Sequence, residues 1–212
     1  MVPPLPVGGL DGRKHERRHQ NILDCAVLDT VAAVSRSIAK HRWVTPNMVT
    51  LAGNVMRFTG VALFALRIAP VAAVLLTAAG IYFDNVDGHL ARLTHRVTDF
   101  GDMFDHYSDW LWGASLTVVY FLRYFSWERH KMWLTAFVTV MLLVYTVQFG
   151  SLETLYHRRC PDEGGSSNTT AFTKRLTSMD PGKLALATRP VAGNVMLALL
   201  TLAFMWRCYN PL

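Results

Sequence analysis

Four aspartates stand at the ends of two apolar segments in the stretch DNVDGHLARLTHRVTDFGDMFDHYSD, residues 84–109. They are Asp84, Asp87, Asp105 and Asp109, in the order D-x2-D-G-x2-A-R-x8-G-x3-D-x3-D. Carboxylates are costly near a bilayer, so a group of four needs compensating cations and usually has a function. Oxygen ligands suit Mg²⁺, which often bridges carboxylates and substrate phosphates. The spacing therefore predicts metal ions that hold a diphosphate at a membrane surface.

Each acidic pair shares one helix face with small residues, because successive residues turn by about 100°. The first face carries Asp84, Asp87, Gly88 and Ala91, and the second carries Gly101, Asp105 and Asp109. A tight turn through residues 93–98 would make the two helices antiparallel, so that the acidic faces could meet. Gly88 and Gly101 remove side chains where a ligand or the neighbouring helix must approach closely. Arg92 lies just beyond the first acidic face and could pair with a phosphate.

Solvated charges at helix ends are the simpler interpretation of such aspartates. One or two of them would often be that, but four on matching faces with two glycines and an arginine favour a site. An EF-hand is excluded because the alternating oxygen ligands and the terminal glutamate are absent.

The elements that must position these residues are apolar helices. The chain has 212 residues, of which 51% are hydrophobic and 17% charged, whereas soluble domains carry about 25% charged residues. Long apolar runs predict one all-α integral membrane protein, a bundle of about five to six transmembrane helices. The candidate spans are residues 47–67, 70–92, 99–122, 132–156 and 186–207.

The residues before the first span fall into two segments. Residues 1–20 are rich in Pro and Gly and then basic, which is typical of a flexible tail. Residues 21–43 alternate apolar and polar residues at helical spacing, and charges interrupt them too often for a span. This pattern predicts an amphipathic helix lying in the interface, followed by a membrane domain over residues 44–212. The N-terminus has no apolar h-region, so no cleavable signal peptide is expected.

Charge predicts the orientation and the partners. The net charge is +6, and most Lys and Arg residues flank the apolar runs on one side of the predicted bundle. The positive-inside rule makes that side cytosolic, and the four aspartates lie on it. The pattern does not distinguish the endoplasmic reticulum from a bacterial inner membrane. Basic and aromatic residues are not interleaved as in a nucleic-acid surface, so anionic lipid headgroups and a diphosphate explain the basicity better.

The pattern from Asp84 to Asp109 resembles the full signature of the CDP-alcohol phosphatidyltransferase family, with no motif position missing. Upstream, Thr45-Pro46-Asn47-Met48-Val49-Thr50 resembles the P-N-x-x-T segment that opens the first span in that family. The resemblance covers residues 45–150, and the remainder by topology only. It implies a metal-dependent transfer of a substituted phosphoryl group from a CDP-linked donor to an alcohol, with release of CMP.

The resemblance also implies roles for single residues. Asp84, Asp87, Asp105 and Asp109 would bind Mg²⁺ or Mn²⁺, with two ions expected, and Asp109 would also be the general base on the acceptor hydroxyl. The CDP pocket would be lined by Asn47, Thr50, Asp87, Gly88, Ala91 and Arg92, with Gly101 as a structural glycine of the motif.

Two further arginines are candidate phosphate contacts. Arg57 lies about ten residues into the first span, where an arginine normally faces a polar cavity, so it touches either a substrate phosphate or an aspartate. Many family members carry an arginine three residues after the Thr of the opening segment, where this chain has Gly53, and Arg57 could substitute for it. Arg189 opens the fifth predicted span and is the second candidate.

The motif does not identify the donor or the acceptor. Gly88-His89 and Phe100-Gly101 look similar to eukaryotic phosphatidylinositol synthases, whereas Phe104-Asp105-His106 resembles choline/ethanolamine phosphotransferases, which use CDP-amino-alcohols and diacylglycerol. We favour CDP-diacylglycerol as donor and inositol as acceptor. Membrane lipids and a second copy of the chain are the other expected partners. An intramembrane prenyltransferase and a catalytically silent membrane scaffold are the alternatives from other classes.

Overall fold

The computed structural model describes residues 12–125, 129–159 and 180–209, and within them it has helices and no strand. After a short 3-10 turn, η1 (Arg17–His19), the helices are α1 (Ile22–Ala39), α2 (Pro46–Leu66), α3 (Pro70–Leu93), α4 (Asp99–Arg123), α5 (Arg129–Arg159), α7 (Pro181–Thr188) and α8 (Asn194–Tyr209). The predicted all-α class is confirmed for this part of the chain.

The helices that carry the motif begin with strong local signals. Pro46 opens α2 and Pro70 opens α3, at positions where a missing backbone N–H is no loss. The Thr98 hydroxyl accepts a hydrogen bond from the Gly101 N–H at 3.0 Å and caps α4. Between α3 and α4, His95 adopts a left-handed conformation with φ 53°. The tight turn predicted between the two acidic faces is therefore present.

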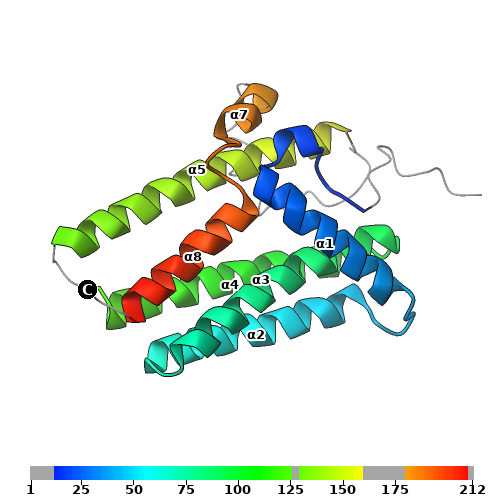
Figure 1. Ribbon diagram of the computed structural model, residues 1–212. Coiled ribbons are helices and arrows are strands. Elements are labelled where there is room, and N and C mark those ends of the chain that lie inside the picture. The colour runs from blue at the N-terminus through cyan, green and yellow to red at the C-terminus, as the bar shows by residue number, and fades with distance from the viewer. Residues whose placement is uncertain (1–11, 126–128, 160–179, 210–212) are drawn as a thin grey trace, which may run out of the picture.

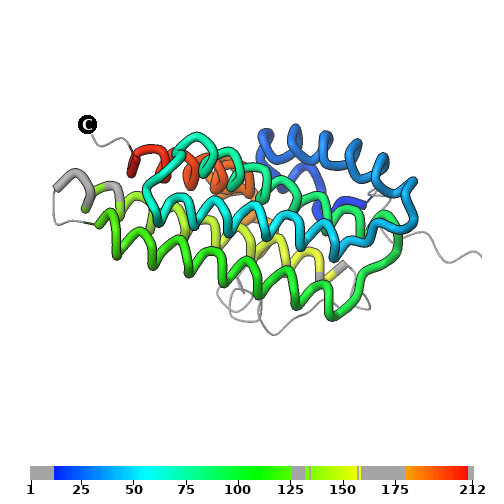
Figure 2. The backbone as a smooth tube through the Cα atoms, turned by 90° about the horizontal axis from the view of Figure 1, so that it is seen from below, coloured from blue at the N-terminus to red at the C-terminus, as the bar shows by residue number. Residues whose placement is uncertain are grey.

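Helix α2 lies between α3 and α4 (Figure 2) and packs most extensively against α3. Glycines make this approach close, because a Cβ on Gly60 would lie 2.9 Å from the carbonyl oxygen of Ala73. About one turn further along α2, the ring of Phe64 stacks on that of Tyr124 at 4.4 Å between centroids. The Tyr124 hydroxyl donates to the Phe64 carbonyl at 2.7 Å. The C-terminal end of α2 is thus packed against the start of α3 and the end of α4.

The fifth predicted span, 186–207, is wrong as a single helix. The chain leaves α7 at Thr188 and enters α8 only at Asn194, and Figure 1 shows the connection as a bend. Pro190 explains the break, since it lacks a backbone N–H and its ring clashes with the preceding turn. The new helix start is satisfied by Asp24 of α1, whose carboxylate accepts from the Val195 N–H at 2.8 Å.

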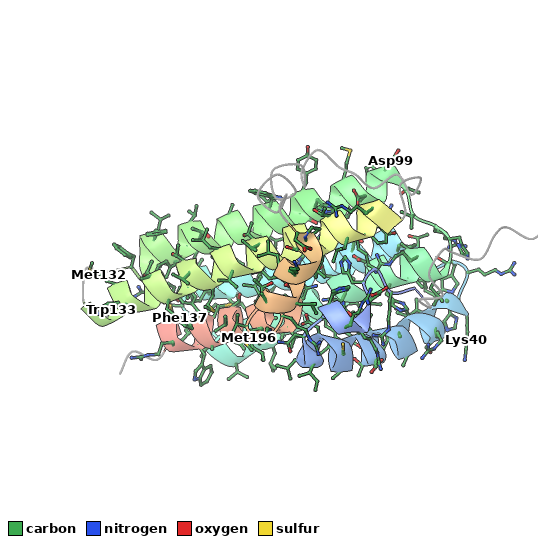
Figure 3. The ribbon with its side chains drawn as sticks, turned by 90° about the horizontal axis from the view of Figure 1, so that it is seen from above. Lys40, Asp99, Met132, Trp133, Phe137 and Met196 are labelled. Atoms are coloured by element: carbon green, nitrogen blue, oxygen red, sulfur yellow. The ribbon has the colours of Figure 1, made fainter. Side chains whose placement is uncertain are left out.

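Two helices are long and apolar enough to cross a membrane, namely residues 46–66 and 135–156, and α8 is a shorter apolar helix. Large apolar side chains such as Leu122 and Leu143 are exposed on the outer surface of the bundle. Figure 3 places Met132, Trp133 and Phe137 at one end of the molecule and Lys40 and Asp99 at the other. This arrangement is consistent with a helical membrane bundle, while the number of spans stays a prediction.

Residues 12–20 differ from the flexible tail expected for residues 1–20. His19 and Gln20 are buried, and Gln148 of α5 donates a hydrogen bond to the His19 carbonyl at 3.0 Å. Residues 1–11 lie outside the described residues. Helix α1 occupies the place of the predicted amphipathic helix, whose position in the interface stays a prediction.

Candidate active site

Three of the four motif aspartates meet at the α3–α4 junction. One carboxylate oxygen from each of Asp84, Asp105 and Asp109 lies within 4.8 Å of the others. Spacings of three and four residues place these side chains on the facing sides of their helices. The prediction that the two acidic faces meet is confirmed for these three.

Asp87 stands one helical turn from Asp84 and does not belong to this group of three oxygens. Its side chain is buried, at 3% exposure, and lies beside the Thr50 hydroxyl of α2. The opening segment of α2 therefore reaches the acidic face of α3, as the motif implies.

Arg57 reaches the aspartates from inside α2. Its Nη1 lies 2.5 Å from Asp109 Oδ1 and 3.0 Å from Asp84 Oδ1, and its Nη2 donates to Asn54 Oδ1 at 2.5 Å. The guanidinium also lies over the Trp112 ring, 5.5 Å from the centroid. Of the two contacts proposed for Arg57, the structure shows the one to aspartates.

Asn54 and Trp112 also belong to the site, although neither was expected there. Asn54 could have been found, because it precedes Arg57 by three residues and therefore lies on the same face of α2. Trp112 could have been found in the same way, because it follows Asp109 by three residues on the acidic face of α4.

The carboxylates fit a hard divalent cation. Within the described part of the chain, Asp84 Oδ1, Asp87 Oδ2 and Asp105 Oδ1 are buried and have no hydrogen-bond partner, although Asp84 Oδ1 is ion-paired with Arg57. Burying a carboxylate oxygen without a hydrogen-bond partner costs free energy, which a bound cation would offset. Mg²⁺ and Mn²⁺ accept carboxylate ligands of this kind, so the donor set suits either ion.

The other motif residues lie around the acidic face. A Cβ on Gly101 would stand 3.1 Å from Asn47 Oδ1, so the starts of α2 and α4 are adjacent. A Cβ on Gly88 would stand 3.4 Å from Nη1 of Arg92, and Ala91 is the neighbour of Arg92 along α3. The Arg92 side chain donates from Nε to the Gly12 carbonyl at 2.7 Å. Arg92 thus contacts the N-terminal segment in this structure.

That N-terminal segment, residues 12–19, is anchored mainly on α5. Lys14 Nζ lies 2.7 Å from Glu153 Oε1, and burial lowers the pKa of the neighbouring His15 to about 3. Arg189 donates to the Arg18 carbonyl at 2.9 Å. The structure therefore shows Arg189 in contact with this segment, and not with the aspartates.

Comparison with known proteins agrees with the motif. The family model for CDP-alcohol phosphatidyltransferase matches residues 43–207. An archaetidylinositol phosphate synthase from Aeropyrum pernix is 33% identical over 105 residues, which cover 48% of this chain and 52% of that protein. The chain thus spans about half the length of this curated relative. No solved structure matches the chain. Because the family model covers most of the chain and all four motif aspartates, the chain belongs to the CDP-alcohol phosphatidyltransferase family.

Proposed function

We propose that the protein is a metal-dependent phospholipid synthase. It transfers a phosphatidyl group from CDP-diacylglycerol to an alcohol, with inositol favoured, and releases CMP. The observation that carries the proposal is the convergence of Asp84, Asp105 and Asp109 inside the region that matches the family.

The four aspartates would hold the cofactor, which we propose to be two ions of Mg²⁺ or Mn²⁺. When bound, the ions neutralise a diphosphate and stabilise the departing CMP. The nucleotide would lie against Asn47, Thr50, Gly88, Ala91 and Arg92. The position of Thr50 beside Asp87 supports this pocket, because it joins the nucleotide residues of α2 to the acidic face.

Asp109 is the proposed general base. The acceptor hydroxyl oxygen attacks the phosphorus that carries the diacylglycerol, its proton passes to Asp109, and the bond from that phosphorus to the CMP oxygen breaks. A positioned carboxylate is useful because an alcohol has too high a pKa to attack unaided. The Asp109 side chain is 44% exposed against 22% for Asp84, so an acceptor can reach it more easily.

The two arginines proposed as phosphate contacts, Arg57 and Arg189, have different partners in the structure. Arg57 can reach a donor phosphate only after its ion pair with the aspartates opens, and Arg189 would have to leave the Arg18 carbonyl. We therefore retain Arg57 as the better candidate.

The choice of inositol as acceptor rests on the resemblance at Gly88-His89 and on the name of the Aeropyrum relative, which refers to an inositol phosphate lipid. We also propose a multi-pass membrane protein with the site on the cytosolic side, on the strength of the charge distribution.

One assay tests these substrates. Purified protein is incubated with labelled CDP-diacylglycerol, Mg²⁺ or Mn²⁺, and either inositol, inositol phosphate, glycerol phosphate or serine, while CMP and labelled lipid are measured. A parallel reaction contains CDP-choline or CDP-ethanolamine with diacylglycerol. Product only in the parallel reaction would make the protein an amino-alcohol phosphotransferase. No CMP from any CDP-linked donor would defeat the proposal and favour the silent scaffold.

The base is tested by Asp109→Asn, with Asp99→Asn on the same helix as the matched control. Asp99 is exposed at the first turn of α4. We expect Asp109→Asn to lower turnover by about 10²- to 10⁴-fold, the usual contribution of a general base. Asp99→Asn should retain turnover. Retained turnover in Asp109→Asn would refute the assignment.

A further inference from the structure

Arg57 occupies the place where a cation is needed. It is 3% exposed, and its Nη1 contacts Asp84 and Asp109, two of the three carboxylates that meet. A buried arginine inside an apolar helix normally needs such partners. Without Arg57, three carboxylates would face one another with no adjacent positive charge from α2.

Arg57 and a divalent ion compete for the same carboxylate oxygens. Mg²⁺ binds oxygen at about 2.0–2.1 Å, in a nearly octahedral shell. Asp84 Oδ1 and Asp109 Oδ1 already contact the guanidinium at 3.0 and 2.5 Å. An ion held by Asp84 and Asp109 would therefore have to share their charge with the adjacent guanidinium, whose like charge opposes it.

We propose that Arg57 is a built-in counter-ion that neutralises the aspartates without metal and swings away when a divalent ion binds. The inference rests on the proposed function, since it assumes that the aspartates bind metal. Arg57 is thus a positioning residue that sets metal affinity, and it acts through Asp84 and Asp109.

The surroundings of Arg57 suit this movement. Asn54 accepts from Nη2 and so helps to hold the guanidinium where it contacts the aspartates, and the Trp112 ring centroid lies 5.5 Å from the guanidinium carbon. An aromatic face stabilises a cation that has lost its carboxylate partners. Gly80 leaves room for the stem, because a Cβ there would collide with it. The guanidinium can therefore tilt towards Trp112 once its bond to Asn54 opens.

The test is the affinity for Mn²⁺ of the purified full chain, measured from the free-ion EPR signal. Arg57→Met should bind Mn²⁺ at least about tenfold more tightly than wild type, because the ion no longer displaces a buried ion pair. Arg67→Met is the matched control, since it removes an arginine at the other end of α2 that lies over Tyr124. Its affinity should equal that of wild type.

A second variant keeps the charge. Asn54→Ala removes one hydrogen bond from the guanidinium, loosens its hold and should tighten Mn²⁺ binding by about two- to tenfold. This variant tests the proposal even where Arg57→Met does not fold, which circular dichroism without metal reveals.

The outcomes separate the inference from the proposed function. Tighter binding in Arg57→Met or Asn54→Ala, with Arg67→Met unchanged, supports a competing counter-ion. Equal or weaker binding in the folded Arg57→Met and Asn54→Ala variants overturns it, even where the enzyme transfers phosphatidyl groups. No Mn²⁺ binding by wild type would defeat the metal site itself, and the inference with it.

Discussion

Gly80→Ala should lower the free energy of unfolding, whereas most glycine-to-alanine substitutions in helices raise it. A Cβ at Gly80 would lie 2.6 Å from the Gly53 carbonyl oxygen and 2.9 Å from the Arg57 nitrogen. Both atoms belong to the backbone of α2, so no side-chain rotation relieves the clash. The added methyl group must push α2 away from α3 at the place where Arg57 reaches Asp84.

The magnitude follows from two opposing effects. Overpacking of this kind costs about 1–3 kcal/mol of unfolding free energy. Replacing glycine by alanine at an unstrained helix position instead stabilises by about 0.4–1 kcal/mol. Gly113 of α4 provides the matched control, because a Cβ there meets nothing within 4 Å among the described residues. The gain from replacing glycine by alanine is common to both variants. They should therefore differ by the overpacking cost, about 1–3 kcal/mol, with Gly80→Ala the less stable.

Unfolding in mixed micelles, followed by circular dichroism, measures the difference. Equal stability of the two alanine variants would refute the close approach of α2 and α3, and with it the geometry given for Arg57.

Two further predictions concern residues 12–19. Glu153→Gln removes the ion pair with Lys14, so tryptic cleavage after Lys14 should be about tenfold faster, as expected from losing a charge-assisted contact; an unchanged rate would contradict the anchoring. Burial lowers the pKa of His15 from 6.5 to about 3, so the unfolded chain binds a proton below pH 6.5 that the folded segment does not. Stability should therefore be complete above pH 6.5 and fall as the pH drops from 6.5 towards 3. Melting temperatures from pH 7.5 to 5 should show a steeper loss in wild type than in His15→Gln, and equal slopes would exclude His15 as the cause.

The sequence predicted the helices of the motif well because their signals are local. Thr45-Pro46 and Thr98 start helices, and the spacing of apolar residues locates α2, α3 and α4 within a few residues. The break between α7 and α8 was missed although Pro190 is visible in the sequence. Hydropathy averaged over a long window hides one proline, and the cap that makes a new helix start at Asn194 comes from Asp24, far away in the chain.

In the site too, helical spacing predicted which residues share a helix face, but not which residues of other elements they contact. Helical spacing correctly placed Asp84, Asp105 and Asp109 together, because positions three and four residues apart share a face. It also grouped Asp87 with them, and Asp87 interacts electrostatically with Asp84 and Asp105 while its side chain contacts Thr50 of the neighbouring helix. The contact between Arg92 and Gly12 joins residues 80 positions apart, and composition indicated only a flexible tail there. Such contacts depend on packing between elements, which a single sequence does not encode in its spacing.

Arg57 and the aspartates each lower the free-energy cost of burying the other's charge. An arginine within α2 costs free energy in an apolar bundle, and so do the carboxylates at the ends of α3 and α4. Both costs fall only when the three helices assemble, so the ion pair couples formation of the site to formation of the fold. A metal ion that bound the aspartates would leave the guanidinium beside the Trp112 ring without a carboxylate partner. A donor diphosphate beside the metal would compensate that charge, and the metal and the donor should therefore favour each other's binding.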